Sequence, residues 1–201
     1  MASSIQLSLQ MQKGSKADGT LGYMTEEQYE QLVNSDFVEQ AGHRRIIGYA
    51  SNTSSHSIEI NYADSVQQEL TFCVPTHGAA PEKANEIATT DLALKALGVE
   101  PEIGAEVPLE FELRGKTYHY DMVLSGWWEA SNDSVSVATV SEQFIKENPD
   151  VVQNTYAVDH EMSGVTFSDV MLKNKANVQQ QLNEFCLLYT SPSPRDGLLS
   201  R

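Results

Sequence analysis

The sequence lacks any long apolar run. No stretch of its 201 residues approaches the roughly 20 consecutive apolar residues that a membrane-spanning helix needs. The opening "MASSIQLSLQMQKG" also lacks the basic start and continuous apolar core of a secretory signal peptide. Taken as complete from Met1, the chain is expected to be a soluble cytoplasmic protein.

Basic residues are scarce. The chain has 13 Lys and Arg against 28 Asp and Glu, for a net charge of −15. Nucleic acid and anionic membrane surfaces repel such a chain, so nucleic acid is excluded as a partner. The acidity suits a domain that meets a cationic ligand, but solubility alone is the commoner explanation of such a charge.

Cysteine is rarer still. Cys73 and Cys186 could form one disulfide, but two cysteines make no disulfide framework and have no metal-ligand spacing. Apolar residues make up 40% of the chain, which at this length supports a real core in one domain or two small ones.

Catalytic motifs are missing as well. The sequence has no nucleophile elbow and no glycine loop placed to hold phosphate. Asp159, His160 and Glu161 are consecutive, so they cannot all point at one ion from a helix or strand. We expect no catalytic residue, no cofactor and no metal site. A hydrolase site assembled from these three residues and His77 is the weaker hypothesis.

What is present predicts an α+β fold with mixed sheets and short helices. Thr25 and Gln28 form a capping box, and Tyr29, Leu32 and Val33 are expected on the inner face of the helix that follows. Further helices are expected at 91–97, 141–148 and 174–185, with one helical turn at 64–70. Strands are expected at 44–51, 56–63, 71–74, 85–90, 107–113, 117–129, 135–140 and 164–172.

Thr90 is expected to cap the helix over 91–97, whose inward residues would be Leu92, Ala93, Ala96 and Leu97, and Gly98 to end it in the left-handed conformation. The tripeptide "RGK" at 114–116 is expected to join two strands as a hairpin, with the register between the strands left open.

Two adjacent tryptophans stand in an extended segment, "SGWWEAS". Because side chains alternate along a strand, Trp127 and Trp128 should point to opposite faces. One is expected in the core and the other at an edge or an interface, which makes this pair the candidate interface residues.

The stretch "GAAPEKANEIATTDLALKALGVEPEIGAEVPLEF" resembles the extracytoplasmic domain of FtsX-like ABC transporter permeases, the group with the MacB-type core domain. "YMTEEQYEQL", "YDMVLSGWWE" and "VSEQFIKEN" are also similar to that pattern, and the resemblance covers roughly residues 15–185. It implies a ferredoxin-like (porter-like) part and a small β-rich subdomain inserted at roughly residues 50–130.

The resemblance also implies a function. The domain would be non-enzymatic and would face outward from a bacterial cell membrane, between the first and second membrane helices of the permease. It would bind substrate or partners, or relay movement, while a separate ATP-binding subunit hydrolyses ATP. No catalytic residue carries over. The acidic charge adds a cationic peptide as the expected substrate.

Both ends depart from that pattern. Residues 1–14 would be a stub after a missing first membrane helix. Residues 186–201 begin "CLLYTSPSPRD", which resembles a transposase-end sequencing adapter translated in frame. They are therefore interpreted as a non-native tail that should pack against nothing. The alternative function is a free-standing soluble ligand-binding or sensor domain, complete at Met1.

Overall fold

The computed structural model describes residues 5–9, 15–53, 57–130 and 136–190. Their strands form one 11-stranded sheet that mixes parallel and antiparallel pairs. The strands are β1 (Gln6–Leu9), β2 (Gly19–Met24), β3 (Val38–Ala41), β4 (Arg44–Tyr49), β5 (Ile58–Ala63), β6 (His77–Gly78), β7 (Glu86–Thr90), β8 (Glu106–Leu113), β9 (Lys116–Trp128), β10 (Ser136–Val140) and β11 (Thr166–Leu172).

The helices between these strands are short. They are α1 (Glu26–Val33), α2 (Ser65–Leu70), α3 (Asp91–Leu97), α4 (Glu142–Glu147), the 3-10 helix η1 (Pro149–Val152), α5 (Tyr156–Asp159) and α6 (Val178–Thr190). The predicted α+β class with a mixed sheet and short helices is confirmed.

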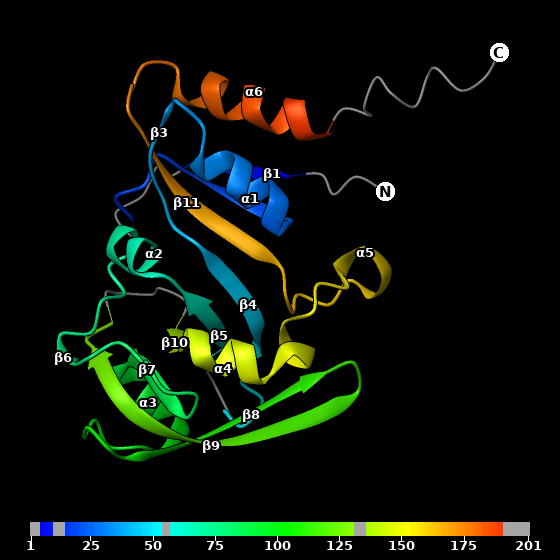
Figure 1. Ribbon diagram of the computed structural model, residues 1–201. Coiled ribbons are helices and arrows are strands. Elements are labelled where there is room, and N and C mark those ends of the chain that lie inside the picture. Colours follow the sequence, from blue (N-terminus) through cyan, green and yellow to red (C-terminus); the bar gives the residue numbers. More distant parts are fainter. Residues whose placement is uncertain (1–4, 10–14, 54–56, 131–135, 191–201) are drawn as a thin grey trace.

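The sheet connects segments that are distant in the sequence. Its order is β1-β2-β11-β4-β5-β10-β7-β9-β6, with β3 also pairing with β11 and β8 with β9. Figure 1 shows β11 and β4 running through the middle of the molecule, α1 and α6 above them, and the long β8–β9 hairpin below. The pairs β5–β10 and β7–β9 are parallel.

Local signals set several element ends as expected. Thr25 and Gln28 form the capping box that begins α1. Thr90 caps α3, and Gly98 ends it with a φ of 72°. Arg114 and Gly115 form the two-residue turn between β8 and β9, and both have positive φ, as in a type I′ hairpin turn.

Buried apolar residues form two clusters. In the large cluster, β4, β5 and β7–β10 pack with α3, α4 and η1. In the small cluster, β2, β3 and β11 pack with α1 and α6. Their largest members include Phe111 and Phe144 in the first, and Leu21, Met24 and Leu32 in the second. The division of residues 15–185 into two subdomains, and the ferredoxin-like part, stay predictions.

A buried polar network holds α2 against β11. Asp169, only 4% exposed, accepts a hydrogen bond from the hydroxyl of Thr20 at 2.6 Å and one from the side-chain amide of Gln67. The backbone N–H of Asp169 in turn donates to Gln67 Oε1 at 3.1 Å. A buried carboxylate is tolerated here because each of its oxygens has a donor.

Some expectations about buried faces were wrong. Val33 is 46% exposed and Leu92 39% exposed, whereas Gln28 and Leu94 are buried in their helices. Short helices near a sheet bury a face set by the strands they touch, and their own apolar pattern only approximates it. The strand expected at 71–74 is also absent, because Phe72 has a φ of 57° and the chain turns there.

The expectation that nothing after Phe185 packs was wrong for two residues. α6 continues to Thr190, and its helical period brings Cys186 and Tyr189 against the small cluster. The rings of Phe185 and Tyr189 lie 4.8 Å apart. Residues 191–201 lie outside the described residues, and the adapter origin of the tail stays a prediction.

Cys73 and Cys186 form no disulfide bond with each other. Within the described ranges, no helix combines the length and the apolar character needed to cross a bilayer.

Candidate functional site

A pocket of about 910 Å³ opens where β2 ends and α1 begins. We call it the Tyr23 pocket. Its size is in the range of ligand sites for small molecules. Its lining residues come from β1, β2, α1, β4, β11 and the segment around α5: Ile5, Gln6, Tyr23, Met24, Thr25, Glu26, Arg45, Val152, Asn154, Tyr156, Ala157, Gly164, Val165 and Thr166.

Tyr23 reaches this pocket from a β-bulge. Met24 lies opposite Thr166 and Gly22 opposite Phe167, so Tyr23 is an extra residue in its strand. Its φ of 61° is a left-handed conformation that costs a side-chain-bearing residue free energy. Bulges of this kind re-aim side chains and are frequent beside functional sites.

Three aromatic rings meet at the bulge. The ring of Tyr23 lies 4.8 Å from that of Tyr156 and 5.4 Å from that of Phe167, between centroids. Gly22 makes room for the third ring, since a Cβ there would lie 2.5 Å from Phe167 Cε1. Partial burial, together with the neighbouring Tyr156 hydroxyl, raises the pKa of Tyr23 above its ordinary value.

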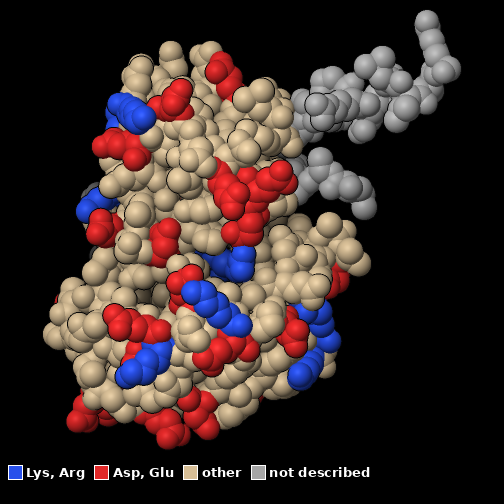
Figure 2. Space-filling view, in the orientation of Figure 1, with Lys and Arg blue, Asp and Glu red and all other residues tan. Residues whose placement is uncertain are grey.

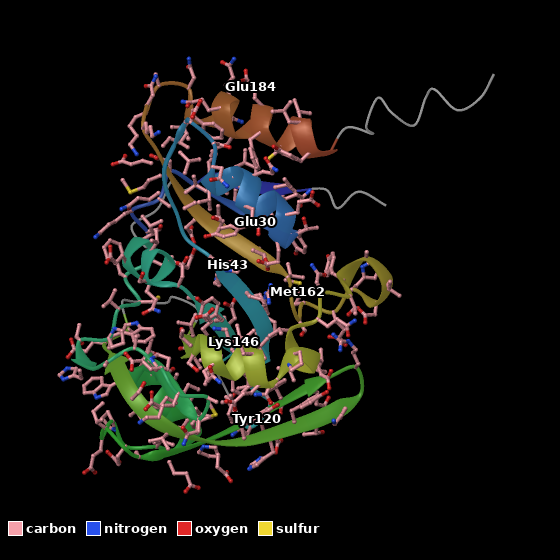
Figure 3. The ribbon with its side chains drawn as sticks, in the orientation of Figure 1. Glu30, His43, Tyr120, Lys146, Met162 and Glu184 are labelled. Carbon is pink, nitrogen blue, oxygen red and sulfur yellow. The ribbon has the colours of Figure 1, made fainter. Side chains whose placement is uncertain are left out.

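Glu26 supplies the pocket's carboxylate from the first turn of α1. Its Oε1 atom accepts hydrogen bonds from Arg45 and, at 2.9 Å, from the hydroxyl of Thr166, and lies 3.4 Å from His43 Nε2. Burial alone would raise the pKa of Glu26, but His43 and Arg45 outweigh it and hold the pKa at about 2. Figure 3 shows His43 near the middle of the molecule, between α1 and α4.

One wall of the pocket belongs to residues 149–161, which contain η1 and α5; we call them the α5 segment. Arg114, at the tip of the β8–β9 hairpin, donates to the carbonyls of Asp150 at 3.3 Å and Gln153 at 2.9 Å, and to the hydroxyl of Thr155 at 3.3 Å. Its guanidinium also lies 3.6 Å from Asp159 Oδ2. The hairpin tip therefore holds the segment that carries Tyr156.

The hydrolase hypothesis gains no support from geometry. His77 lies in β6 and Asp159 in α5, on opposite sides of the molecule (Figure 1). His77 instead stacks on Trp127, with 3.8 Å between ring centroids. Among the described residues, no group of three or more His, Cys, Asp or Glu side chains could hold a metal ion.

The tryptophan pair alternates as its strand requires. Trp128 is 5% exposed and packs in the core, whereas Trp127 lies where β9 pairs with β6 at the edge of the sheet. An interface role for Trp127 and Trp128 stays a prediction.

The residues of the Tyr23 pocket were not found from the sequence. Tyr23, Arg45 and Tyr156 are far apart along the chain, and pairing between β2, β4 and β11 brings them together. The one available signal was the capping box, because it places Glu26 at a strand-to-helix junction.

No protein-family model matches this sequence, and no curated protein matches it. Its structure is similar to the extracellular domain of the noncanonic ABC-type transporter YknZ from Gram-positive bacteria, with a TM-score of 0.49 and 15% identity over 81% of this chain and 78% of that one. It is also similar to a domain of a protein described as a permease, from Porphyromonas gingivalis, with a TM-score of 0.47 and 9% identity over 89% of this chain and 71% of that one.

These domains are of the class that the sequence motifs indicated. Since both TM-scores are below 0.5, neither likeness carries a ligand, a partner or a mechanism over to this chain.

Proposed function

We propose that this chain is the extracytoplasmic domain of an ABC transporter permease subunit, facing outward from a bacterial membrane. It is non-catalytic. It binds a ligand or partner in the Tyr23 pocket and relays a conformational change to the transmembrane remainder and to a separate ATP-binding subunit. The observation that carries the proposal is that the α5 segment belongs both to the pocket wall and to the Arg114 contacts.

The relay follows from those shared contacts. A ligand in the Tyr23 pocket changes the free energy of the α5 segment's positions, because Asn154, Tyr156 and Ala157 face the pocket. Movement of the segment must either carry the β8–β9 hairpin with it or break the bonds of Arg114 to the Asp150 and Gln153 carbonyls. Either outcome changes the hairpin end, which is distant in sequence from β2 and α1.

The permease part of the proposal rests on the sequence resemblance. The residues that carry it form β7, α3 and the strand β8, with the helix ending at Gly98 as that pattern implies. Under this proposal residues 15–185 are the permease domain, residues 1–14 follow its first membrane helix, and residues 186–201 derive from an adapter. A ferredoxin-like part and a β-rich insert at roughly 50–130 belong to the same proposal.

Sequencing the genomic locus on both sides of this reading frame tests the permease assignment. We expect the frame to continue past Phe185 into several apolar spans, without "CLLYTSPSPRD", and to lie beside an ATPase gene. If the genome instead encodes the tail and a stop codon after Arg201, the permease assignment fails. The free-standing ligand-binding or sensor domain, which would use the same pocket, then takes its place.

The relay is tested by Arg114→Asn. Asparagine tolerates the positive φ of the turn better than arginine does, so the hairpin should stay folded. The α5 segment, in contrast, loses its contacts with the guanidinium. Hydrogen exchange measured on the full chain should then be about tenfold faster at residues 154–160, for a loss of about 1.4 kcal/mol from a set of partly exposed hydrogen bonds.

Lys116→Asn is the matched control, because Lys116 follows the same turn and its ammonium lies over the ring of Tyr118. Unchanged exchange at 154–160 in Arg114→Asn, or equal acceleration in both variants, would show that Arg114 does not hold the segment.

A further inference from the structure

The charges inside the Tyr23 pocket cancel. Among the residues that the structure describes, Glu26 and Arg45 are the only charged ones in its lining, and they form an ion pair with each other. The whole chain carries a net charge of −15, so this local neutrality contrasts with the surface around it. A cationic ligand would meet the guanidinium of Arg45 and an anionic ligand the carboxylate of Glu26. The pocket therefore favours a neutral ligand.

Hydrogen-bonding capacity remains beside that ion pair. Arg45 and Thr166 both use Glu26 Oε1, which leaves Oε2 without a hydrogen bond among the residues that the structure describes. Arg45 bonds through Nη2, and its Nε is buried with no partner within the described part of the chain. Glu26 Oε2 is thus an unused acceptor, and the guanidinium of Arg45 lies beside the same carboxylate in the pocket lining. Hydroxyl groups suit such a surface, since each donates one hydrogen bond and accepts two.

Apolar and aromatic residues line the pocket beside the polar side chains of Gln6, Thr25 and Asn154. Met24 and Val165 are fully buried and line it together with the rings of Tyr23 and Tyr156. Such rings pack well against the C–H face of a flat, saturated ring, and the tyrosine hydroxyls add polar contacts at its rim. A ligand that fits has one apolar face and an edge of hydroxyl groups.

We propose that the Tyr23 pocket binds a neutral saccharide, with the sugar ring against Tyr23 and Tyr156 and its hydroxyls on Glu26 and Arg45. This inference rests on the proposed function of the pocket as a ligand site. It differs from the cationic peptide that the overall charge suggested, because the pocket itself offers no unbalanced negative charge.

The proposal is tested by titrating the full chain with neutral disaccharides and monitoring its amide chemical shifts by NMR. The probes are cellobiose, maltose, trehalose and diacetylchitobiose, with pentalysine and pentaalanine as peptide arms. We expect at least one disaccharide to saturate, with shifts confined to residues 22–26, 154–157 and 164–166. Its affinity should not change with NaCl, because no net charge is neutralised on binding.

Variants locate the site. Tyr156→Ala should weaken saccharide binding about threefold to tenfold, the usual contribution of an aromatic contact. Phe72→Ala is the matched control, because Phe72 is a 50% exposed ring outside the pocket, and it should bind as the parent does. Glu26→Gln keeps the size of the side chain but leaves Arg45 unbalanced, so it should weaken binding of neutral sugars and begin to admit glucuronate.

Three results would overturn the proposal: no disaccharide saturates, the shifts lie elsewhere, or pentalysine binds at these residues in a salt-sensitive way. The permease assignment fails separately. If the locus encodes membrane spans but no saccharide binds, only the ligand class is wrong. If a saccharide binds but the genome encodes a stop codon after Arg201, only the permease assignment is wrong.

Discussion

At the scale of single residues, backbone strain gathers around one segment. Five described residues other than glycine have positive φ, and three of them, Tyr23, Arg114 and His160, contact or belong to the α5 segment. Left-handed backbone costs such residues about 1 kcal/mol or more each. The surrounding contacts must over-determine these conformations, and such strain is typical of ligand clamps and switch regions.

Glu26 should make the protein sensitive to acid in a defined window. Its pKa is about 2 in the folded chain and about 4.5 ordinarily. A lowered carboxyl pKa stabilises the folded state above the ordinary value, and that contribution is lost as pH falls from about 4.5 toward 2. Because the side chain is about half exposed, solvent screening limits the contribution to about 1 kcal/mol.

Urea unfolding of the parent and Glu26→Gln at a series of pH values measures this contribution. The difference between the two free energies of unfolding should be constant above about pH 5 and shrink below it. Glu27→Gln is the control, since Glu27 is the exposed neighbour in the same helical turn. A difference that does not vary with pH would mean that the ion pair with Arg45 does not stabilise the fold.

At the scale of elements, prediction from the sequence succeeded where a signal is local. Thr25 with Gln28, Thr90 and Ser141 begin their helices through hydrogen bonds within three residues, and Gly98 ends one by its own backbone freedom. The alternation of Trp127 and Trp128 follows from strand geometry alone.

Prediction failed where a segment distant in the sequence determines the local conformation or the burial of a residue. The bulge at Tyr23 exists because β2 pairs with β11, about 145 residues later. The helical spacing of Tyr29, Leu32 and Val33 predicted that Val33 faces the core, yet the strands under α1 leave it exposed. The same reason explains why the pocket was missed, since its walls come from six separate elements.

The last turn of α6 should contribute measurably to stability. A chain truncated after Phe185 loses the contacts of Cys186 and Tyr189 with the small cluster, including the bond from the Tyr189 hydroxyl to Gln31 Oε1. Half-buried side chains of this size predict a loss of about 1 kcal/mol.

A chain truncated after Thr190 keeps those contacts and is the matched control. The difference between the urea midpoints of the two chains measures what the last turn of α6 contributes to stability. Equal midpoints would mean that residues 186–190 add nothing to the fold, whatever the origin of their sequence.

At the scale of the whole molecule, repulsion between acidic side chains opposes folding. Figure 2 shows Asp and Glu over both the upper and the lower part of this face, with Lys and Arg lying among them. A net charge of −15 is large for a 201-residue chain and destabilises its compact state. Salt shortens the range of that repulsion to about 8 Å at physiological ionic strength.

We therefore expect NaCl at physiological concentration to raise the free energy of unfolding by about 1 kcal/mol over a low-salt buffer. The measurement is urea unfolding at both ionic strengths. A triple variant, Glu100→Gln, Glu102→Gln and Glu106→Gln, removes three exposed charges and should gain less from salt. An equal gain in both chains would assign the effect to general ion exclusion and not to charge repulsion.

The position of β11 in the sheet has a consequence for how this protein is made. The strand that β2 pairs with, β11, leaves the ribosomal exit tunnel some 145 residues after β2 itself. The large cluster, drawn from residues 47–152, has all its members before β11 emerges, so it can form first. Until then Leu21, Met24 and Leu32 lack the members of the small cluster that β11 and α6 supply. Until β11 emerges, the nascent chain therefore exposes the apolar side chains of β2 and α1 to chaperones.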